Sequence, residues 1–127
     1  MTPKQRNEEL EKRLIDYTVR ILNVAEQLPG TYAGQHFAKQ IIRSGSSPAL
    51  HFGEARGAES RKDYRHKLSI LVKEVRETHI NLRIICRKQY IPEHLLEEII
   101  DESNQIISIF TATIRTLDKN DKTAKRA

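Results

Sequence analysis

The chain has 127 residues, of which 38% are hydrophobic and 31% are charged, and its formal net charge is +5. This length suits one domain with a core of its own. The apolar runs are too short to cross a bilayer, and the first residues lack the apolar segment of a secretory signal, so we expect a cytoplasmic protein without membrane contact. Cys86 is the only cysteine, which excludes an internal disulfide and an all-cysteine zinc site.

Charge is segregated along the chain. Residues 1–38 hold five basic and five acidic side chains, whereas residues 39–91 hold twelve basic and five acidic ones. Residues 92–118 reverse this balance with one basic and six acidic, and residues 119–127 add four basic and one acidic. On helices this pattern predicts a basic side and an acidic side, suited to a polyanion or to head-to-side self-association. The plain alternative is an ordinary solvated surface.

Apolar residues recur at steps of three and four, which predicts long amphipathic helices. These cover about residues 6–28, 31–57, 60–89 and 92–118, and a frayed basic tail follows over residues 119–127. No segment alternates in the way a strand does. Long helices with short links predict an all-α fold in one domain, an antiparallel up-and-down four-helix bundle.

Local signals mark the helix ends. We expect Thr31 to cap the second helix, Ser60 with Asp63 to open the third, and Pro92 to lie in the first turn of the fourth. Inside the second helix, Ser44-Gly45-Ser46-Ser47-Pro48 has the composition of a loop. We interpret it as a bent or loosened turn of one continuous helix. Its small residues would admit a neighbouring helix, and a serine hydroxyl could satisfy the carbonyl that the proline frees.

The sequence contains no catalytic or metal motif. Di-iron bundles use Glu-x-x-His pairs, and here no Glu is followed by a His three residues later. HExxH, CxxC and glycine-rich phosphate loops are also missing. We interpret Cys86 as a small core residue. We therefore expect no enzyme activity, no metal and no cofactor.

The basic residues around the third helix form the candidate site. Some recur at spacings of three or four, so they can share a helix face and hold phosphates. No aromatic residues alternate with them, which favours structured RNA or backbone contact over single-strand stacking. The candidate nucleic-acid-binding residues are Arg56, Arg61, Lys62, Arg65, Lys73, Arg76, Arg83, Arg87 and Lys88.

Four carboxylates lie among these cations, namely Glu54, Asp63, Glu74 and Glu77. We interpret them as a structural polar network that fixes the register of the second and third helices. Glu54 is expected close to the core face, and the expected partners are Arg43, Arg56 or Lys73. The alternative is a carboxylate cluster that does acid–base chemistry, but it has no nucleophile or cofactor beside it.

Residues 46–68, SSPALHFGEARGAESRKDYRHKL, and their continuation LVKEVRETHINLRII to Ile85 resemble a known family. It is the four-helix-bundle family associated with intervening sequences in bacterial 23S ribosomal RNA genes. The match rests on a small-residue turn, the step Glu54-Ala55, and Ser60-Arg61-Lys62-Asp63-Tyr64 at the start of the third helix. At His51 the sequence departs from an amide residue often seen in the family.

The resemblance implies a left-handed bundle and a homo-oligomer, with a pentamer favoured. More distantly, the chain is similar to the accessory proteins of diversity-generating retroelements, which share the fold and are thought to help a reverse transcriptase through a basic surface. Neither relationship brings a catalytic residue.

The leading hypothesis is a non-enzymatic homo-oligomer whose basic surface on the second and third helices binds RNA phosphates. The alternative is a protein-interaction scaffold or accessory subunit, in which the basic face docks a partner or the acidic fourth helix of the next copy. An enzyme would need a metal or a closed polar pocket around Glu54, Glu74 and Glu77.

Overall fold

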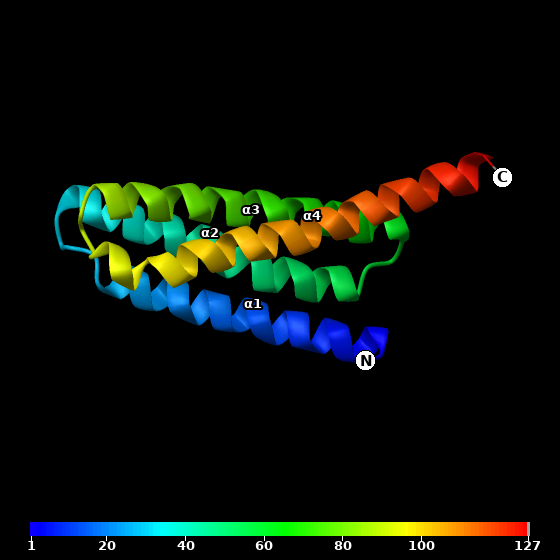
Figure 1. The fold of residues 1–127 in the computed structure, drawn as a ribbon, viewed down its shortest axis with the longest axis horizontal. Coiled ribbons are helices and arrows are strands. Elements are labelled where there is room, and N and C mark those ends of the chain that lie inside the picture. The colour runs from blue at the N-terminus through cyan, green and yellow to red at the C-terminus, as the bar shows by residue number, and fades with distance from the viewer. Residues whose placement is uncertain (127) are drawn as a thin grey trace.

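The computed structural model describes residues 1–126, and the side chains of residues 1–124. Its helices are α1 (Pro3–Glu26), α2 (Tyr32–Arg56), α3 (Arg61–Arg87), the short 3-10 helix η1 (Glu93–Leu95) and α4 (Glu97–Arg126). Successive long helices run in opposite directions, and α4 returns beside α1 and α3 (Figure 1). The predicted all-α four-helix bundle is confirmed, whereas its left-handedness stays a prediction. Over residues 1–126, no helix is long and apolar enough to cross a membrane.

The residues predicted to open α2 and α3 do so. The side-chain oxygens of Thr31 and Ser60 each accept a hydrogen bond from the backbone N–H three residues later, at 3.1 and 3.0 Å. These bonds satisfy amides that the first helical turn leaves free. α1 begins three residues earlier than predicted, because Thr2 and Gln5 form a reciprocal capping box in front of it.

The link between α3 and α4 differs from the prediction. Gln89 has a φ of 64°, and the N–H of Tyr90 donates to the carbonyl of Ile85, which is a common way to end a helix. Pro92 then has a ψ of 139° and precedes η1, and α4 begins only at Glu97. Pro92 was therefore wrongly placed inside the fourth helix. Proline fixes φ but not ψ, so it suits an extended residue before a turn equally well.

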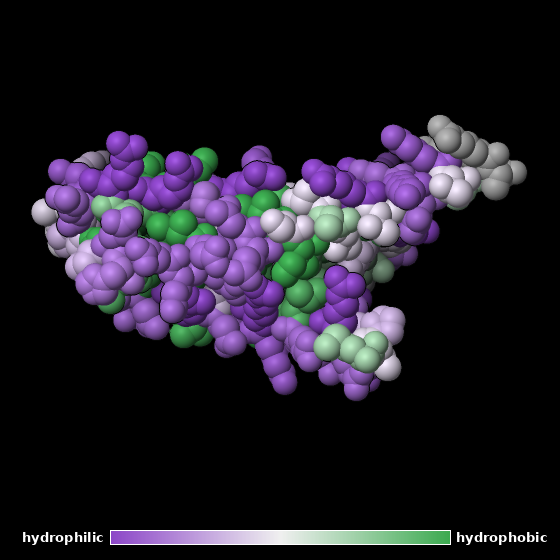
Figure 2. All heavy atoms as spheres, in the orientation of Figure 1, coloured by the Kyte–Doolittle hydropathy of each residue, from purple (hydrophilic) through white to green (hydrophobic). Residues whose placement is uncertain are grey.

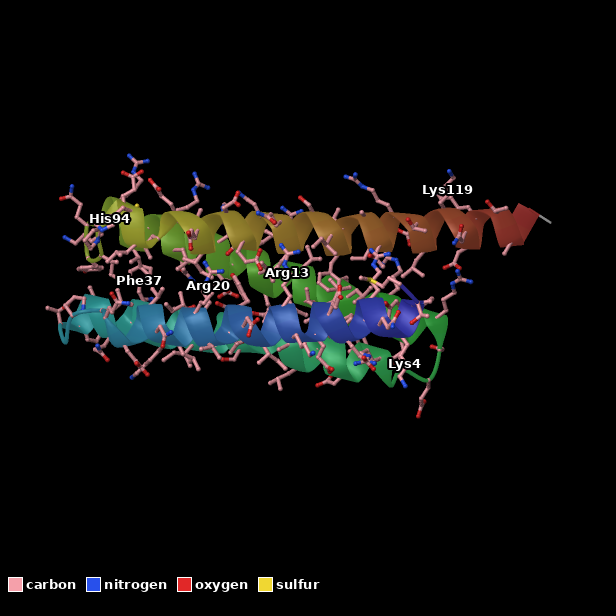
Figure 3. The ribbon with its side chains drawn as sticks, turned by 60° about the horizontal axis from the view of Figure 1, so that its bottom comes forward. Lys4, Arg13, Arg20, Phe37, His94 and Lys119 are labelled. Carbon is pink, nitrogen blue, oxygen red and sulfur yellow. The ribbon has the colours of Figure 1, made fainter. Side chains whose placement is uncertain are left out.

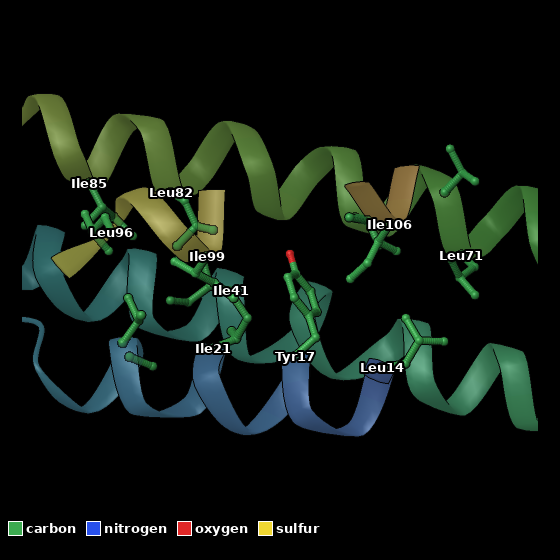
Figure 4. Packing of buried hydrophobic residues seen from close by; sticks show 14 of the residues in the cluster. Leu14, Tyr17, Ile21, Ile41, Leu71, Leu82, Ile85, Leu96, Ile99 and Ile106 are labelled. Atoms are coloured by element: carbon green, nitrogen blue, oxygen red, sulfur yellow. The ribbon is translucent and has the colours of Figure 1, made fainter. Parts of the chain in front are cut away.

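A single apolar core runs along the bundle (Figure 4). Its members lie on the apolar stripes of the helices, and Leu14 and Ile21 of α1, Leu82 of α3 and Ile106 of α4 are almost completely buried. Three apolar residues of α2 that share its predicted pattern, Tyr32, Ile42 and Leu50, are exposed instead. Burying each such side chain contributes about 1.5–3 kcal/mol. These stripes hold the four helices together.

α2 continues across Pro48, as predicted. The small residues do admit a neighbour, because a Cβ at Gly45 would lie 2.5 Å from Cγ2 of Ile21 on α1. The predicted role of the serine hydroxyl needs correction. Pro48 frees the carbonyl of Ser44, but Ser47 Oγ donates to the carbonyl one residue earlier, at 2.8 Å. A serine can reach back four residues along its own helix, and for Ser47 that position is 43.

Midway along the core lies a layer of hydroxyl groups, one from each long helix. Tyr17 Oη is 2.7 Å from Ser103 Oγ, and Thr78 Oγ1 is 2.7 Å from Ser44 Oγ. Burial raises the pKa of Tyr17 to about 12, against the opposing effect of its hydrogen bonds. A shift of any helix along its axis would separate these partners in a dry environment, so the layer favours one register.

The C-terminal residues are a second correction. Residues 119–127 were predicted as a frayed tail, but α4 continues through Arg126, while Ala127 lies outside the described residues. Two aspartates near the end of α4, at 118 and 121, pair with arginines near the start of α3. These pairs hold the helix beyond its last apolar residues, and its final turns project past the bundle (Figure 1).

Candidate functional site

Three of the predicted nucleic-acid-binding residues are tied to neighbouring helices. The pairs are Arg56–Glu11 at 2.9 Å, Arg61–Asp121 at 3.3 Å and Arg65–Asp118, whose Nη2–Oδ2 distance is 2.9 Å. Arg65 donates through Nε as well, and this hydrogen bonding lowers the pKa of Asp118. A carboxylate in contact with a cation cancels much of its electric field. These three arginines therefore attract a phosphate less strongly than three unpaired arginines would.

The other six predicted residues form no ion pair with the side chains of residues 1–124. They are Lys62, Lys73, Arg76, Arg83, Arg87 and Lys88, and all are exposed. The first five follow one another at steps of eleven, three, seven and four, so they form a row on the side of α3 opposite its buried stripe. The row is about 38 Å long at 1.5 Å per residue. We call this row, with Lys88 at its end, the α3 outer face.

Two isoleucines interrupt the α3 outer face. Ile80 and Ile84 are 53% and 42% exposed. With Arg83, Arg87 and Lys88 they line an open hollow of about 500 Å³. This end of the face therefore combines cations with exposed apolar surface. Neither isoleucine was predicted to be part of the site, although both are out of phase with the core stripe of the helix.

The predicted polar network forms in part. Arg43 of α2 pairs with Glu74, at 3.1 Å, and with Glu77, which links α2 to α3 as expected. Glu54 is separate, because it lies eleven residues along α2 from Arg43, or about 16 Å. It is exposed and pairs with Lys67 at 2.8 Å, which lowers the pKa of Glu54.

Two predictions about this network were wrong. Glu54 does not lie near the core face, because α2 turns Phe52 and Ala55 inward at this level. The three glutamates also do not form one cluster. Of the other expected partners, Arg56 binds Glu11 instead, and Lys73 has no carboxylate partner within residues 1–124.

Asp63 has a local role at the start of α3. Its backbone N–H donates to Ser60 Oγ, and its carboxylate lies in the first turn, where the helix dipole favours negative charge. It also contributes, after Glu54, to the raised pKa of Lys67. No three His, Cys, Asp or Glu side chains in the described part of the chain are grouped as metal ligands.

Ion pairs between α1 and α4 were not identified from the sequence. Arg13 contacts Glu102 at 2.6 Å, and Arg20 lies 3.8 Å from Glu98, with both arginines directed from α1 toward α4 (Figure 3). Seven residues separate the arginines and four separate the glutamates, so each pair of like charges lies on one face of its own helix. These helical spacings were the signal in the sequence. These pairs turn two glutamates of the acidic half of α4 toward α1 and away from α3.

The family model described as "23S rRNA-intervening sequence protein" matches residues 6–112. The chain belongs to this family.

One solved structure similar to this family member is a protein of unknown function from the S23 ribosomal protein family of Bacteroides thetaiotaomicron VPI-5482. It is 33% identical, with a TM-score of 0.77, over 82% of this chain and 96% of that chain. No curated protein matches the sequence. The predicted family is thus confirmed, and it specifies the fold without naming a ligand.

Proposed function

We propose that this family member is a non-enzymatic cytoplasmic homo-oligomer that binds the phosphates of structured RNA through the α3 outer face. One observation carries the proposal: five exposed cations lie in a single row on α3, Lys88 follows at the C-cap of that helix, and none of the six has a carboxylate partner within residues 1–124. A row of this kind can follow a phosphate backbone. It has no flat aromatic platform for bases, so recognition depends on shape and charge.

The surface proposed here is narrower than the one predicted from sequence. The share of α2 is small, because Arg43 and Arg56 are both engaged by carboxylates. Arg61 and Arg65 face α4 and become available only if their aspartates release them. The binding face is therefore the outer side of α3 from Lys62 to Lys88.

Exposed apolar side chains on α1 and α2 support the proposed self-association. Ile15 and Val19 of α1 and Ile42 and Leu50 of α2 are large apolar side chains that are exposed. Thr18 of α1 donates a hydrogen bond to the carbonyl of Gly45 on α2, at 3.0 Å, so the two helices that carry these residues lie against each other. Exposed apolar strips mark association sites, and a second copy is the occupant we propose. A pentamer is the assembly that we expect, to be measured by light scattering.

The RNA proposal is tested by fluorescence anisotropy with a hairpin RNA at about 50–200 mM salt. Affinity should fall steeply with salt, and the triple variant R76Q/R83Q/R87Q should reduce the log–log slope by about 3. The matched control R115Q/K119Q/K122Q removes the same charge from exposed positions on α4 and should leave the slope nearly unchanged. No binding at about 50 mM salt, or equal losses in both variants, would refute the proposal.

A second candidate function is supported by charge complementarity within the chain. η1 presents an exposed Leu95, and the start of α4 presents Glu97 and Glu98, of which Glu98 lies 3.8 Å from Arg20. These residues match the isoleucines and cations of the α3 outer face. A neighbouring copy could dock there, and the protein would then act as a scaffold. In that case R83E/R87E would lower the solution mass, and adding E97K/E98K would restore it. If the solution mass stays unchanged in R83E/R87E while RNA binding is lost, the RNA function stands.

A further inference from the structure

The bundle is open at the end where α1 begins. Hydrogen bonds and ion pairs join α1 to α4 only from Arg13 onward, among the side chains of residues 1–124. The first turns of α1 diverge from the second half of α4 (Figure 1), and Figure 2 shows a hollow with apolar atoms at its floor between them. This pocket has a volume of about 350 Å³.

All four long helices supply the floor of the pocket. The floor is made by Leu10 of α1, Phe52 of α2, Tyr64 of α3 and Phe110 of α4, and Met1 and Pro3 add apolar lining beside it. The rings of Phe52 and Phe110 meet edge to face with their centroids 5.4 Å apart, which gives the floor a fixed shape. Tyr64 is part-buried, and this burial raises the pKa of its phenol. Phe52 and Phe110 are already buried, with 1% and 2% of their surface exposed, so the apolar surface that a ligand would newly cover belongs to the part-buried Leu10 and Tyr64.

The rim of the pocket is cationic. Arg6 is the only charged side chain among the lining residues, and it forms no ion pair with residues 1–124. Asn7 and Tyr64 also border a second, wider hollow of about 710 Å³ that contains Lys4. In that hollow Glu59 is the one carboxylate, against Lys4 and two arginines that are already paired. Glu59 offsets Lys4 in that hollow, so the positive charge at the mouth of the pocket comes from Arg6.

We propose that this pocket is a binding site for a small amphipathic anion. An aromatic or short aliphatic body would cover the floor made by Leu10, Phe52, Tyr64 and Phe110, and a carboxylate or a similar group would meet Arg6 at the rim. The volume lies at the lower end of the range for ligand sites, and an apolar lining with a few polar groups is their usual composition. The guanidinium group of arginine matches a carboxylate in two-point geometry. This site is separate from the α3 outer face.

The test uses the full chain labelled with ¹⁵N and two probes, 4-phenylbutyrate and its neutral amide, 4-phenylbutanamide. Amide shifts should change around residues 6–10, 52, 64 and 110, with a dissociation constant for the acid on the order of 1 mM for a ligand of this size. Arg6→Gln should weaken the acid about fivefold and leave the amide unchanged, since only the acid carries the charge. Lys12→Gln, at an exposed position on α1, is the matched control.

A second pair of variants tests the cavity itself. Thr113 lines the pocket, and its hydroxyl donates only to a carbonyl of its own helix, so Thr113→Phe should fill the space and abolish binding of both probes. Thr116→Phe replaces an exposed threonine with the same local bond and should bind normally. Shifts centred on Ile80 and Ile84, or equal affinity of Arg6→Gln for the acid, would overturn the proposal. If Thr113→Phe fails to fold, the Arg6 comparison decides alone.

Discussion

Arginines lie both at the start of α3 and on the α3 outer face. Those at the start are paired with carboxylates of α4, and within residues 1–124 those on the outer face are not. Arg65 and Arg83 are eighteen residues apart, which is five full turns, so they point in nearly the same direction. Arg65 meets Asp118 of α4, whereas Arg83 has no carboxylate partner within residues 1–124. What differs is the neighbour on α4, since Glu98 and Glu102 in its first half turn to α1. The free charge of a helix is thus set by its partners as much as by its own sequence.

The largest expected effect comes from adding a carboxylate to the α3 outer face, because its cations would then be paired as Arg65 is. Ile80→Glu places an acidic group one turn from both Arg76 and Arg83, so these cations should be neutralised in the way that Arg65 is. RNA affinity should fall about tenfold at about 100 mM salt, measured by anisotropy. Ile80→Gln removes the same apolar side chain without adding charge and should bind within about twofold of the parent chain. An equal loss in both variants would show that apolar contact, not charge, had mattered.

The reverse change removes the carboxylates that are paired with arginines at the start of α3. D118N/D121N keeps the shape of both side chains and removes their charge, so Arg61 and Arg65 should become available to phosphates. We expect RNA affinity to rise about threefold to fivefold and the salt slope to steepen by up to about 2. Circular dichroism should show at most the loss of the last turns of α4, which these pairs hold in place. Unchanged affinity would mean that the bound RNA does not reach the first turns of α3.

Removing a single cation should lower RNA affinity more where the cation is unpaired than where it is paired with a carboxylate. Lys73→Gln on the α3 outer face should weaken RNA binding about threefold and lower the salt slope by about 1. Arg56→Gln, whose partner is Glu11, should change affinity by less than about twofold, because its charge is already opposed. Titrations of both variants in the same buffer provide the comparison, and a larger loss for Arg56→Gln would contradict it.

The smallest expected effect is on stability in acid. Hydrogen bonding to Arg65 lowers the pKa of Asp118, and Lys67 lowers that of Glu54. A carboxyl with a lowered pKa in the folded chain stabilises it above its unfolded pKa, and this contribution is lost as the pH falls through the folded value. The melting temperature should therefore decline below about pH 4. D118N should show less of this decline than the parent chain, whereas K73Q should decline as the parent does.

Much of the architecture could be predicted from local patterns. The stripe with Leu14, Tyr17 and Ile21 buries the residues that its spacing indicated, and Thr31 and Ser60 cap their helices. Such features depend on residues within one or two turns of each other, which a sequence displays directly. The end of α4 could not be predicted in this way, because its last turns depend on contacts with Arg61 and Arg65 of another helix.

The sequence by itself determined the four amphipathic helices, the caps of α2 and α3 and the excess of cations on α3, since helix periodicity, capping and composition are local properties. Only the tertiary structure decided which cations are paired, that Glu54 lies apart from Glu74 and Glu77, and that Phe52, Tyr64 and Phe110 line one pocket. The physical reason is distance. Coulomb interactions and apolar contact act over a few ångströms in space, and the fold brings together residues that are dozens of positions apart in the chain.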